Sequence, residues 1–248
     1  MKFFSLGSGS SGNATLIENE GLYVLIDVGI TQKELLLKLG ELNIGLDMIE
    51  AVIFTHSHID HVRSIKCFKD EIRYGVGGVI SLPAKNYLIP YNSYKISSLE
   101  IMVLPASHDV DTLNFVIKNQ NETLVYITDT GYISKRNLSY LSNADYNFFE
   151  SNHDVKMLMN SARPIFLKQR ILSDVGHLSN EAASEYLMTL IGDKTKEIMF
   201  VHLSDVANTK EICLDTFYNI AKKRNIDVSK ICISCAERYL ISKGGHHD

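Results

Sequence analysis

Three histidines and one aspartate fall within six residues, directly after a short apolar run that ends in Phe54. The run, residues 51–54, is apolar and rich in β-branched side chains, which predicts a buried strand. Buried ionisable groups need a partner that neutralises or binds them, so the polar residues cannot continue that strand into a core. A solvated turn would not require histidine at alternate positions. Imidazole and carboxylate are ligands for zinc, manganese and iron, and the stretch predicts a metal site at a strand end. Its candidate ligands are His56, His58, Asp60 and His61.

The length and composition favour one domain. A chain of 248 residues with 45% hydrophobic content can bury a substantial core, and no linker, charge block or repeat divides it. We predict a single domain over residues 1–248, with residues 243–248, which include His246 and His247, as a flexible tail outside the site. No signal peptide or membrane-spanning run is evident, and four cysteines without disulfide-framework spacing fit a reducing compartment. A cytoplasmic protein without a membrane partner is expected.

A glycine and serine loop over residues 7–13 separates the first two predicted strands and can approach a ligand closely. A plain hairpin connection is an equal alternative. The candidate substrate contacts in this loop are Ser8, Ser10, Ser11 and Asn13. Asp27, at the end of the next predicted strand, is either a carboxylate that steadies a ligand histidine or an ordinary turn former.

Helix signals are clear at some places and weak at others. Thr31 and Glu34 form a capping box for a helix with leucines at helical spacing. A second helix is predicted over residues 62–68, and a last strand over residues 238–241. Residues 168–181 are predicted to be a loop, in which Lys168 and Arg170 either pair with phosphates or are solvated surface charges.

Three further imidazole or carboxylate side chains each follow a predicted apolar strand, as in the opening motif. They are His108, Asp129 and His202. His177 comes just before a helix cap, Ser179 or its neighbour, which is a good place for a side chain that faces a cleft. His153 follows another strand, and we expect it to support the site or contact substrate.

The pattern H-x-H-x-D-H after an apolar strand resembles the signature of the metallo-β-lactamase superfamily of hydrolases. This resemblance implies an α/β fold of the αββα type, with two mixed β-sheets packed face to face and helices on the outer faces. It also implies a ligand set for two divalent metal ions. His56, His58 and His108 would hold one ion, Asp60, His61 and His202 the other, and Asp129 would bridge them.

Residues 5–13, 150–154 and 176–180 resemble corresponding segments of the WalJ/YycJ-type branch, which are regarded as metal-dependent exonucleases acting on DNA. The resemblance implies a phosphodiesterase that hydrolyses nucleic acid with a hydroxide shared by two metal ions. DNA is expected as the substrate rather than RNA. Zinc or manganese is expected, and iron also suits the ligands. His177 would act on the phosphate or leaving group, and Asp60 is the other predicted catalytic residue. A cysteine replaces Asp129 in true β-lactamases, which disfavours antibiotic hydrolysis.

Two other functions remain open at this point. The first is a thiolesterase similar to glyoxalase II, or another small-molecule hydrolase. Thiolesterases of that type share the seven ligands but are not expected to carry the His177 motif. A scaffold with weak or no catalysis, which binds nucleic acid or a protein, is the alternative from another class. The sequence does not distinguish the metal, DNA from RNA, or the oligomeric state.

Overall fold

The computed structural model describes residues 1–79 and 81–245, and the chain divides into two compact units. Unit 1 comprises residues 1–105, 110–121 and 236–248, and unit 2 comprises residues 106–109 and 122–235. The single-domain organisation stays a prediction. Of the predicted tail, residues 246–248, with His246 and His247, lie outside the described residues.

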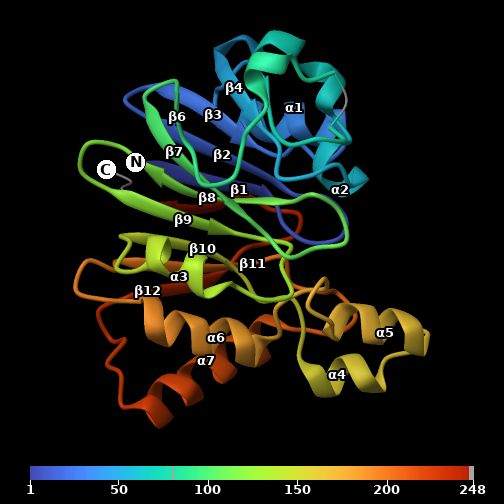
Figure 1. Ribbon diagram of the computed structural model, residues 1–248, viewed down its shortest axis with the longest axis vertical. Coiled ribbons are helices and arrows are strands. Elements are labelled where there is room, and N and C mark those ends of the chain that lie inside the picture. The colour runs from blue at the N-terminus through green and yellow to red at the C-terminus, as the bar shows by residue number, and fades with distance from the viewer. Residues whose placement is uncertain (80, 246–248) are drawn as a thin grey trace. The chain divides into compact units, whose positions relative to one another are not determined.

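The main sheet of unit 1 has six strands in the order β13-β1-β2-β3-β4-β5 (Figure 1). Its strands are β1 (Lys2–Gly7), β2 (Ala14–Asn19), β3 (Leu22–Ile26), β4 (Ile49–Ile53), β5 (Arg73–Tyr74) and β13 (Ser242–Gly245). β3 and β4 run parallel, so their carboxyl ends meet at one edge of the sheet. That edge delivers Asp27 and the histidine motif.

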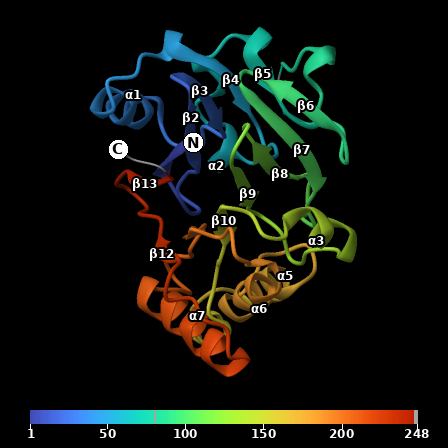
Figure 2. The same cartoon turned by 90° about the vertical axis from the view of Figure 1, so that its left-hand side faces the viewer.

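One long helix packs on this sheet. α1 (Gln32–Glu41) begins at Thr31 with the predicted capping box, in which Glu34 completes the pair of hydrogen bonds. Leu35 and Leu39 of α1 are buried in the same core as Leu25 and Val52 of the sheet. Figure 2 shows α1 beside β2 and β3. Helical spacing of leucines therefore predicted the buried positions of Leu35 and Leu39, whereas Leu36 of the same series is 44% exposed.

The second predicted helix of unit 1 is shorter than expected. α2 (Ile59–Val62) has only four residues, and a 3₁₀ turn follows over Ile65–Cys67. Ser64 ends the helix because its backbone N–H donates to the Val28 carbonyl, 2.9 Å, and its hydroxyl to the Ile30 carbonyl, 2.6 Å. Tertiary hydrogen bonds thus replace the helical ones. The other 3₁₀ turns of unit 1 are Leu46–Met48, Asp70–Ile72 and Ala84–Asn86.

Unit 1 also contains three antiparallel strands in the order β8-β7-β6. They are β6 (Ser93–Ile96), β7 (Leu99–Pro105) and β8 (Leu113–Lys118). The final strand of the chain lies at residues 242–245 rather than at 238–241, and it pairs antiparallel with β1. Residues 243–245, assigned to the flexible tail from the sequence, are therefore part of the sheet.

Unit 2 has four parallel strands in the order β12-β11-β10-β9. They are β9 (Thr123–Ile127), β10 (Tyr146–Glu150), β11 (Glu197–Val201) and β12 (Cys232–Cys235). Parallel pairing again places their carboxyl ends at one edge, from which Asp129, Glu150 and His202 project. The helices are α3 (Lys135–Leu141), α4 (Val155–Asn160), α5 (Ile165–Leu172), α6 (Asn180–Leu190) and α7 (Lys210–Arg224).

Aromatic contacts and paired helices build the core of unit 2. Tyr126 and Phe148 stack with ring centroids 5.1 Å apart, and Phe200 meets Phe217 of α7 edge to face at 5.4 Å. α6 packs against α7 (Figure 1). In the part of the chain that the structure describes, no helix combines the length and apolar character needed to cross a lipid bilayer.

Part of the predicted loop over residues 168–181 is helical. α5 extends to Leu172, and Ile171 is buried in a small cluster with Leu158 of α4 and Ala207. Leu167 packs on the same cluster, one helical turn before Ile171. Pro164 at the N-cap and this spacing were the available signals, but neither is strong in so short a helix.

Candidate metal centre

Asp27 organises the ligand segment of unit 1. This carboxylate is fully buried at the end of β3, where its Oδ1 accepts the Thr55 N–H at 2.8 Å. Its Oδ2 lies 2.8 Å from both the Thr55 hydroxyl and Nδ1 of His61. A carboxylate on Nδ1 fixes the ring of a metal-binding histidine and leaves Nε2 for the metal. Burial raises the pKa of Asp27, although the neighbouring His61 opposes the rise. Of the two readings of Asp27, this geometry supports the steadying carboxylate.

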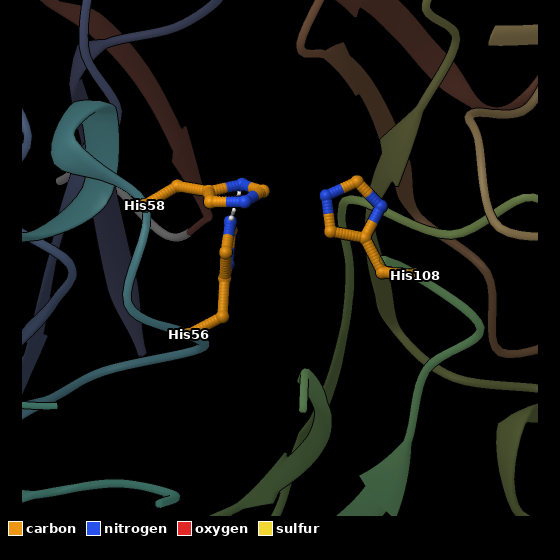
Figure 3. Close-up of side chains that lie close together, drawn as sticks. All are labelled: His56, His58 and His108. Carbon is orange, nitrogen blue, oxygen red and sulfur yellow. Dashed lines mark hydrogen bonds between the residues drawn. The ribbon is translucent and has the colours of Figure 1, made fainter. Parts of the chain in front are cut away.

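Thr55 orients a second histidine. Its hydroxyl, which donates to Asp27, lies 2.9 Å from Nδ1 of His56 and accepts from it. Nε2 of His56 then faces Nδ1 of His58 at 3.0 Å, as Figure 3 shows; the figure also labels His108, which belongs to unit 2. Two ring nitrogens that converge without a carboxylate between them are the arrangement that a cation stabilises.

The backbone around Asn13 brings the glycine and serine loop against the motif. The Asn13 N–H donates to the Asp60 carbonyl at 2.8 Å, and its side-chain nitrogen lies 3.0 Å from Nε2 of His61. Asp60 Oδ2 is 3.7 Å from the same ring nitrogen. Gly29 makes this approach feasible, because a Cβ there would lie 1.5 Å from the Asp60 carbonyl oxygen.

The serines of that loop differ from Asn13 in their surroundings. Ser8 is buried, Ser10 is exposed, and the backbone carbonyl of Ser11 accepts a hydrogen bond from Arg63 at 3.1 Å. Among the four predicted contacts in the loop, the side chain of Asn13 reaches His61, a predicted metal ligand.

Three of the site residues have left-handed backbone. φ is 58° at Asp27, 51° at Asp129 and 60° at His202, each just beyond the end of a strand. Residues other than glycine adopt this conformation at a cost of about 1–3 kcal/mol. The turn ends each strand abruptly and redirects the side chain, so the cost is consistent with a functional requirement.

Glu150 is the central acceptor of unit 2. Its side chain is fully buried at the end of β10, with Oε1 2.8 Å from Nδ1 of His177 and 2.9 Å from Nδ1 of His202. Oε2 accepts the N–H groups of Thr130, at 3.0 Å, and Leu178, at 3.3 Å. Burial opposes the charge, but His177 and His202 overcome it and hold the pKa of Glu150 well below its usual range.

Four predicted residues meet around this carboxylate in unit 2. The His177 ring centroid is 5.2 Å from those of His108 and His202. Asp129 Oδ1 lies 3.6 Å from Nδ1 of His177 and 3.5 Å from Nδ1 of His202. Nδ1 of His108 approaches the Gly176 carbonyl at 3.3 Å, and burial lowers the pKa of His108.

The loops that carry these side chains are joined by buried amides. Asn152 donates to the His202 carbonyl at 2.9 Å, and the Asn180 N–H donates to the His153 carbonyl at 2.9 Å. Asn180 and Asn208 exchange side-chain hydrogen bonds of 2.8 and 2.9 Å. This network sets the spacing of the loops after β10 and β11 and before α6.

His153 and Ser179 are part of that support. Ser179 caps α6 by accepting the Ala182 N–H at 3.1 Å, as predicted. His153 is 1% exposed, and its ring nitrogens have no hydrogen-bond partner among the described residues. Burial lowers the pKa of His153 to about 4. So deep a position favours a supporting role over substrate contact.

Sequence reasoning did not identify Glu150 as a site residue. Its one local signal is an acidic side chain at the end of an apolar strand, the same signal that identified Asp129. Of the two basic residues predicted to be surface charges or phosphate partners, Lys168 is buried and donates to the Met159 carbonyl at 2.6 Å. Arg170 contacts Asp109 Oδ2 at 2.6 Å.

The donors suit divalent metal ions. In unit 2, Asp129, Glu150, His177 and His202 offer ligand atoms that lie within 4.8 Å of one another. Glu150 already accepts four hydrogen bonds, so we assign it the role of orienting the histidines. Imidazole and carboxylate donors, each held by a further hydrogen bond, are characteristic of zinc, manganese and iron sites.

Comparisons with known proteins concern the family of the whole chain. Residues 7–85 match the family model described as the metallo-beta-lactamase superfamily. The chain is 31% identical to exodeoxyribonuclease WalJ of Streptococcus pneumoniae over 92% of its length and 90% of that protein, and 31% identical to exodeoxyribonuclease YycJ of Bacillus anthracis over 93% and 92%.

The solved structures show the same fold. The metallo-beta-lactamase fold protein YhfI from Bacillus subtilis aligns over 98% of this chain and 99% of its own, with a TM-score of 0.70 and 19% identity. The predicted αββα fold of two mixed sheets with helices is confirmed. The chain is a metal-dependent hydrolase that belongs to the WalJ/YycJ family of the metallo-β-lactamase superfamily.

Proposed function

We propose that this protein is a dinuclear metal-dependent exonuclease that hydrolyses the phosphodiester bonds of DNA. The observation that carries the proposal is the shared carboxylate of Glu150, which orients one predicted metal ligand, His202, and one histidine outside the ligand set, His177. The relatives WalJ and YycJ, named exodeoxyribonucleases, support DNA as the substrate. A cytoplasmic location is part of the proposal.

The ligand set is the one predicted from the sequence. As the family resemblance implies, His56, His58 and His108 would hold one ion and Asp60, His61 and His202 the other, with Asp129 as a ligand available to both. Two bound divalent ions would supply hydroxide at neutral pH and neutralise phosphate charge. We propose zinc or manganese as the metal, and iron also suits the ligands. Asp27 and Glu150 keep the tautomers of His61 and His202 fixed for this task.

His177 distinguishes a phosphodiesterase from a thiolesterase. A thiolate leaves readily, because a thiol has a pKa of about 8.5, whereas the sugar alkoxide of DNA is a far stronger base and needs a proton. The Glu150 carboxylate accepts the Nδ1–H of His177 and so orients its ring. A proton carried on Nε2 of His177 can then be given to the leaving oxygen.

The test is His177→Ala, with Glu181→Ala on the exposed surface as its control. We expect the variant to retain its fold and both metal ions, measured by circular dichroism and metal analysis, and to lose about 100-fold or more of its turnover of a 5′-phosphorylated DNA strand. Turnover of DNA at the parent rate would contradict the role of His177.

A substrate panel separates the other functions. Single strands of DNA and RNA, a bis-aryl phosphate and S-lactoylglutathione are each tested with zinc, manganese and iron. Preference for DNA is expected. Preference for the thioester would establish the thiolesterase, and salt-dependent DNA binding without turnover under any metal would establish the scaffold.

A further inference from the structure

The segment between β10 and His177 carries an excess of basic residues, and its two acidic residues, Asp154 and Asp174, lie just outside residues 155–173. Residues 155–173 contain four basic residues and no acidic one, although the whole chain has a formal net charge of −4. The basic residues are Lys156, Arg163, Lys168 and Arg170. This segment forms α4 and α5, which we call the α4–α5 hairpin. A local excess of positive charge on an acidic chain indicates an anionic partner.

The hairpin also exposes apolar side chains. Leu158 and Ile171 face inward, where they are buried with Ala207. On the outer side, Phe166 is 70% exposed and Ile165 60%. Exposed aromatic residues interleaved with basic ones are the arrangement with which proteins bind single-stranded nucleic acid, because bases stack on the ring while cations pair with phosphates.

The hairpin adjoins the site residues of unit 2. The His177 N–H donates to the Ile171 carbonyl at 3.0 Å. Arg170 Nη1 contacts Asp109 Oδ2 at 2.6 Å, and Asp109 Oδ1 lies 3.2 Å from Nε2 of His108. Phe166 precedes Arg170 by four residues in the same helix, so both occupy one face of α5.

Lys168 does not contribute to an outer surface. Its ammonium is buried and donates to the Met159 carbonyl, which fastens α5 to α4. Lys156 is exposed and Arg163 is half-buried. Lys156, Arg163 and Phe166 are therefore the exposed or half-buried residues of the hairpin that can meet a ligand, and we call them its outer surface. Arg170, which contacts Asp109, lies four residues after Phe166.

We propose that this outer surface of the α4–α5 hairpin binds a single-stranded segment of the nucleic acid beside the end that is cleaved. The inference rests on the proposed function and deepens it, since it assigns the enzyme frayed or single-stranded ends. Phe166 stacks on a base, which is possible only where the base is not already stacked inside a duplex. Lys156 and Arg163 pair with phosphates.

A second copy of this chain fits the surface less well. A symmetric contact would bring the same patch of each copy together, so Lys156 and Arg163 of one copy would face the same two cations of the other. The phosphate backbone has the complementary charge. Nucleic acid is therefore the occupant that the charge distribution favours.

The test compares a triple variant, K156A/R163A/F166A, with a control matched in residue type, K222A/K223A/Y239A, whose three positions are exposed elsewhere on the chain. For the metal-loaded enzymes we measure kcat/KM on a single-stranded oligonucleotide and on bis(p-nitrophenyl) phosphate, which is too small to reach the hairpin. We expect kcat/KM for the oligonucleotide, divided by kcat/KM for bis(p-nitrophenyl) phosphate, to fall 10-fold or more in the triple variant. In the control this ratio should stay at the parent value.

Binding provides an independent readout. The affinity for an uncleavable phosphorothioate strand is measured over a salt series, where loss of two phosphate contacts should reduce the slope of log K against log salt by about 1.4.

A triple variant with the parent's salt slope and the parent's ratio of kcat/KM values would overturn the inference while leaving the nuclease function intact. If the parent cleaves neither substrate, the proposed function fails, and the phosphorothioate slope alone decides the inference. Loss of a dimer in the triple variant with unchanged affinity would assign the surface to contact between copies and overturn the inference.

Discussion

At the scale of single residues, two buried carboxylates do the same work in the two units. Asp27 holds Nδ1 of His61, and Glu150 holds Nδ1 of both His177 and His202. In each case the carboxylate fixes which ring nitrogen is available for chemistry. In the proposed mechanism the histidines supply the reactivity, and the carboxylates orient their rings.

Glu150→Gln tests that role. The amide keeps the shape, but its NH₂ group cannot accept a hydrogen bond, so either the two imidazole N–H groups on one oxygen or the two backbone N–H groups on the other lose their acceptor. We expect DNA turnover to fall about 10- to 100-fold, with weaker metal binding by titration and a preserved fold. Glu181→Gln, an exposed change of the same chemistry, is the control. An active Glu150→Gln enzyme with normal metal affinity would contradict the assignment.

The buried ring of His153 predicts how the stability of the fold depends on pH. Its pKa is about 4 in the folded chain and near 6.5 when unfolded, so the unfolded state binds more protons between these values. The contribution of His153 to stability is complete above pH 6.5 and is lost as the pH falls toward 4, by at most about 3 kcal/mol. In urea denaturation, His153→Leu should lose less stability than the parent between pH 7 and 5. Equal losses would show that His153 is not the titrating group.

At the scale of elements, the strand ends were predictable and the connections were not. An apolar run followed by His or Asp is a local pattern, and it located the ends of β4, β9 and β11. Glu150 follows the same pattern, but its importance arises only because β10 lies between β9 and β11, which no local signal reports. α5 and the shortened α2 depend on tertiary contacts of Ile171 and Ser64, and sequence reasoning missed both.

Gly29→Ala tests how closely two elements of unit 1 must approach. The added Cβ would fall on the Asp60 carbonyl, which belongs to backbone and cannot rotate away. We expect a loss of at least about 3 kcal/mol in the free energy of unfolding, together with weakened metal binding. Gly40→Ala is the matched control, since a Cβ in that helix meets nothing, and it should stabilise by about 0.5–1 kcal/mol. Similar effects of the two changes would refute the argument.

At the scale of the whole molecule, unit 1 joins the beginning and the end of the described chain. β13 pairs with β1 through four residue pairs, Phe3 with Gly244 among them. Sequence reasoning identified a last strand but placed it four residues early, because its four residues, Ser-Lys-Gly-Gly, have almost no strand character. Pairing with β1 overrides that weak propensity.

Deleting residues 242–248 should therefore weaken the unit. Without β13, the backbone groups of β1 lose their partners on one edge, which we expect to cost about 2–4 kcal/mol in chemical denaturation. The exposed edge should also promote aggregation, measurable by light scattering. Deletion of residues 246–248 alone is the control. If the chain without β13 has the parent's free energy of unfolding, the pairing of β13 with β1 contributes little.

The left-handed backbone at Asp27, Asp129 and His202 carries a consequence for the engineering and evolution of this chain. Glycine accepts that conformation freely, so replacing Asp129 with glycine relieves backbone strain while it removes a proposed metal ligand. Heat-resistance screens alone would enrich such inactive variants, whereas lineages under selection for hydrolysis must keep the strained aspartate and compensate elsewhere. Thermostable libraries of this chain should accordingly be sorted on turnover from the first round.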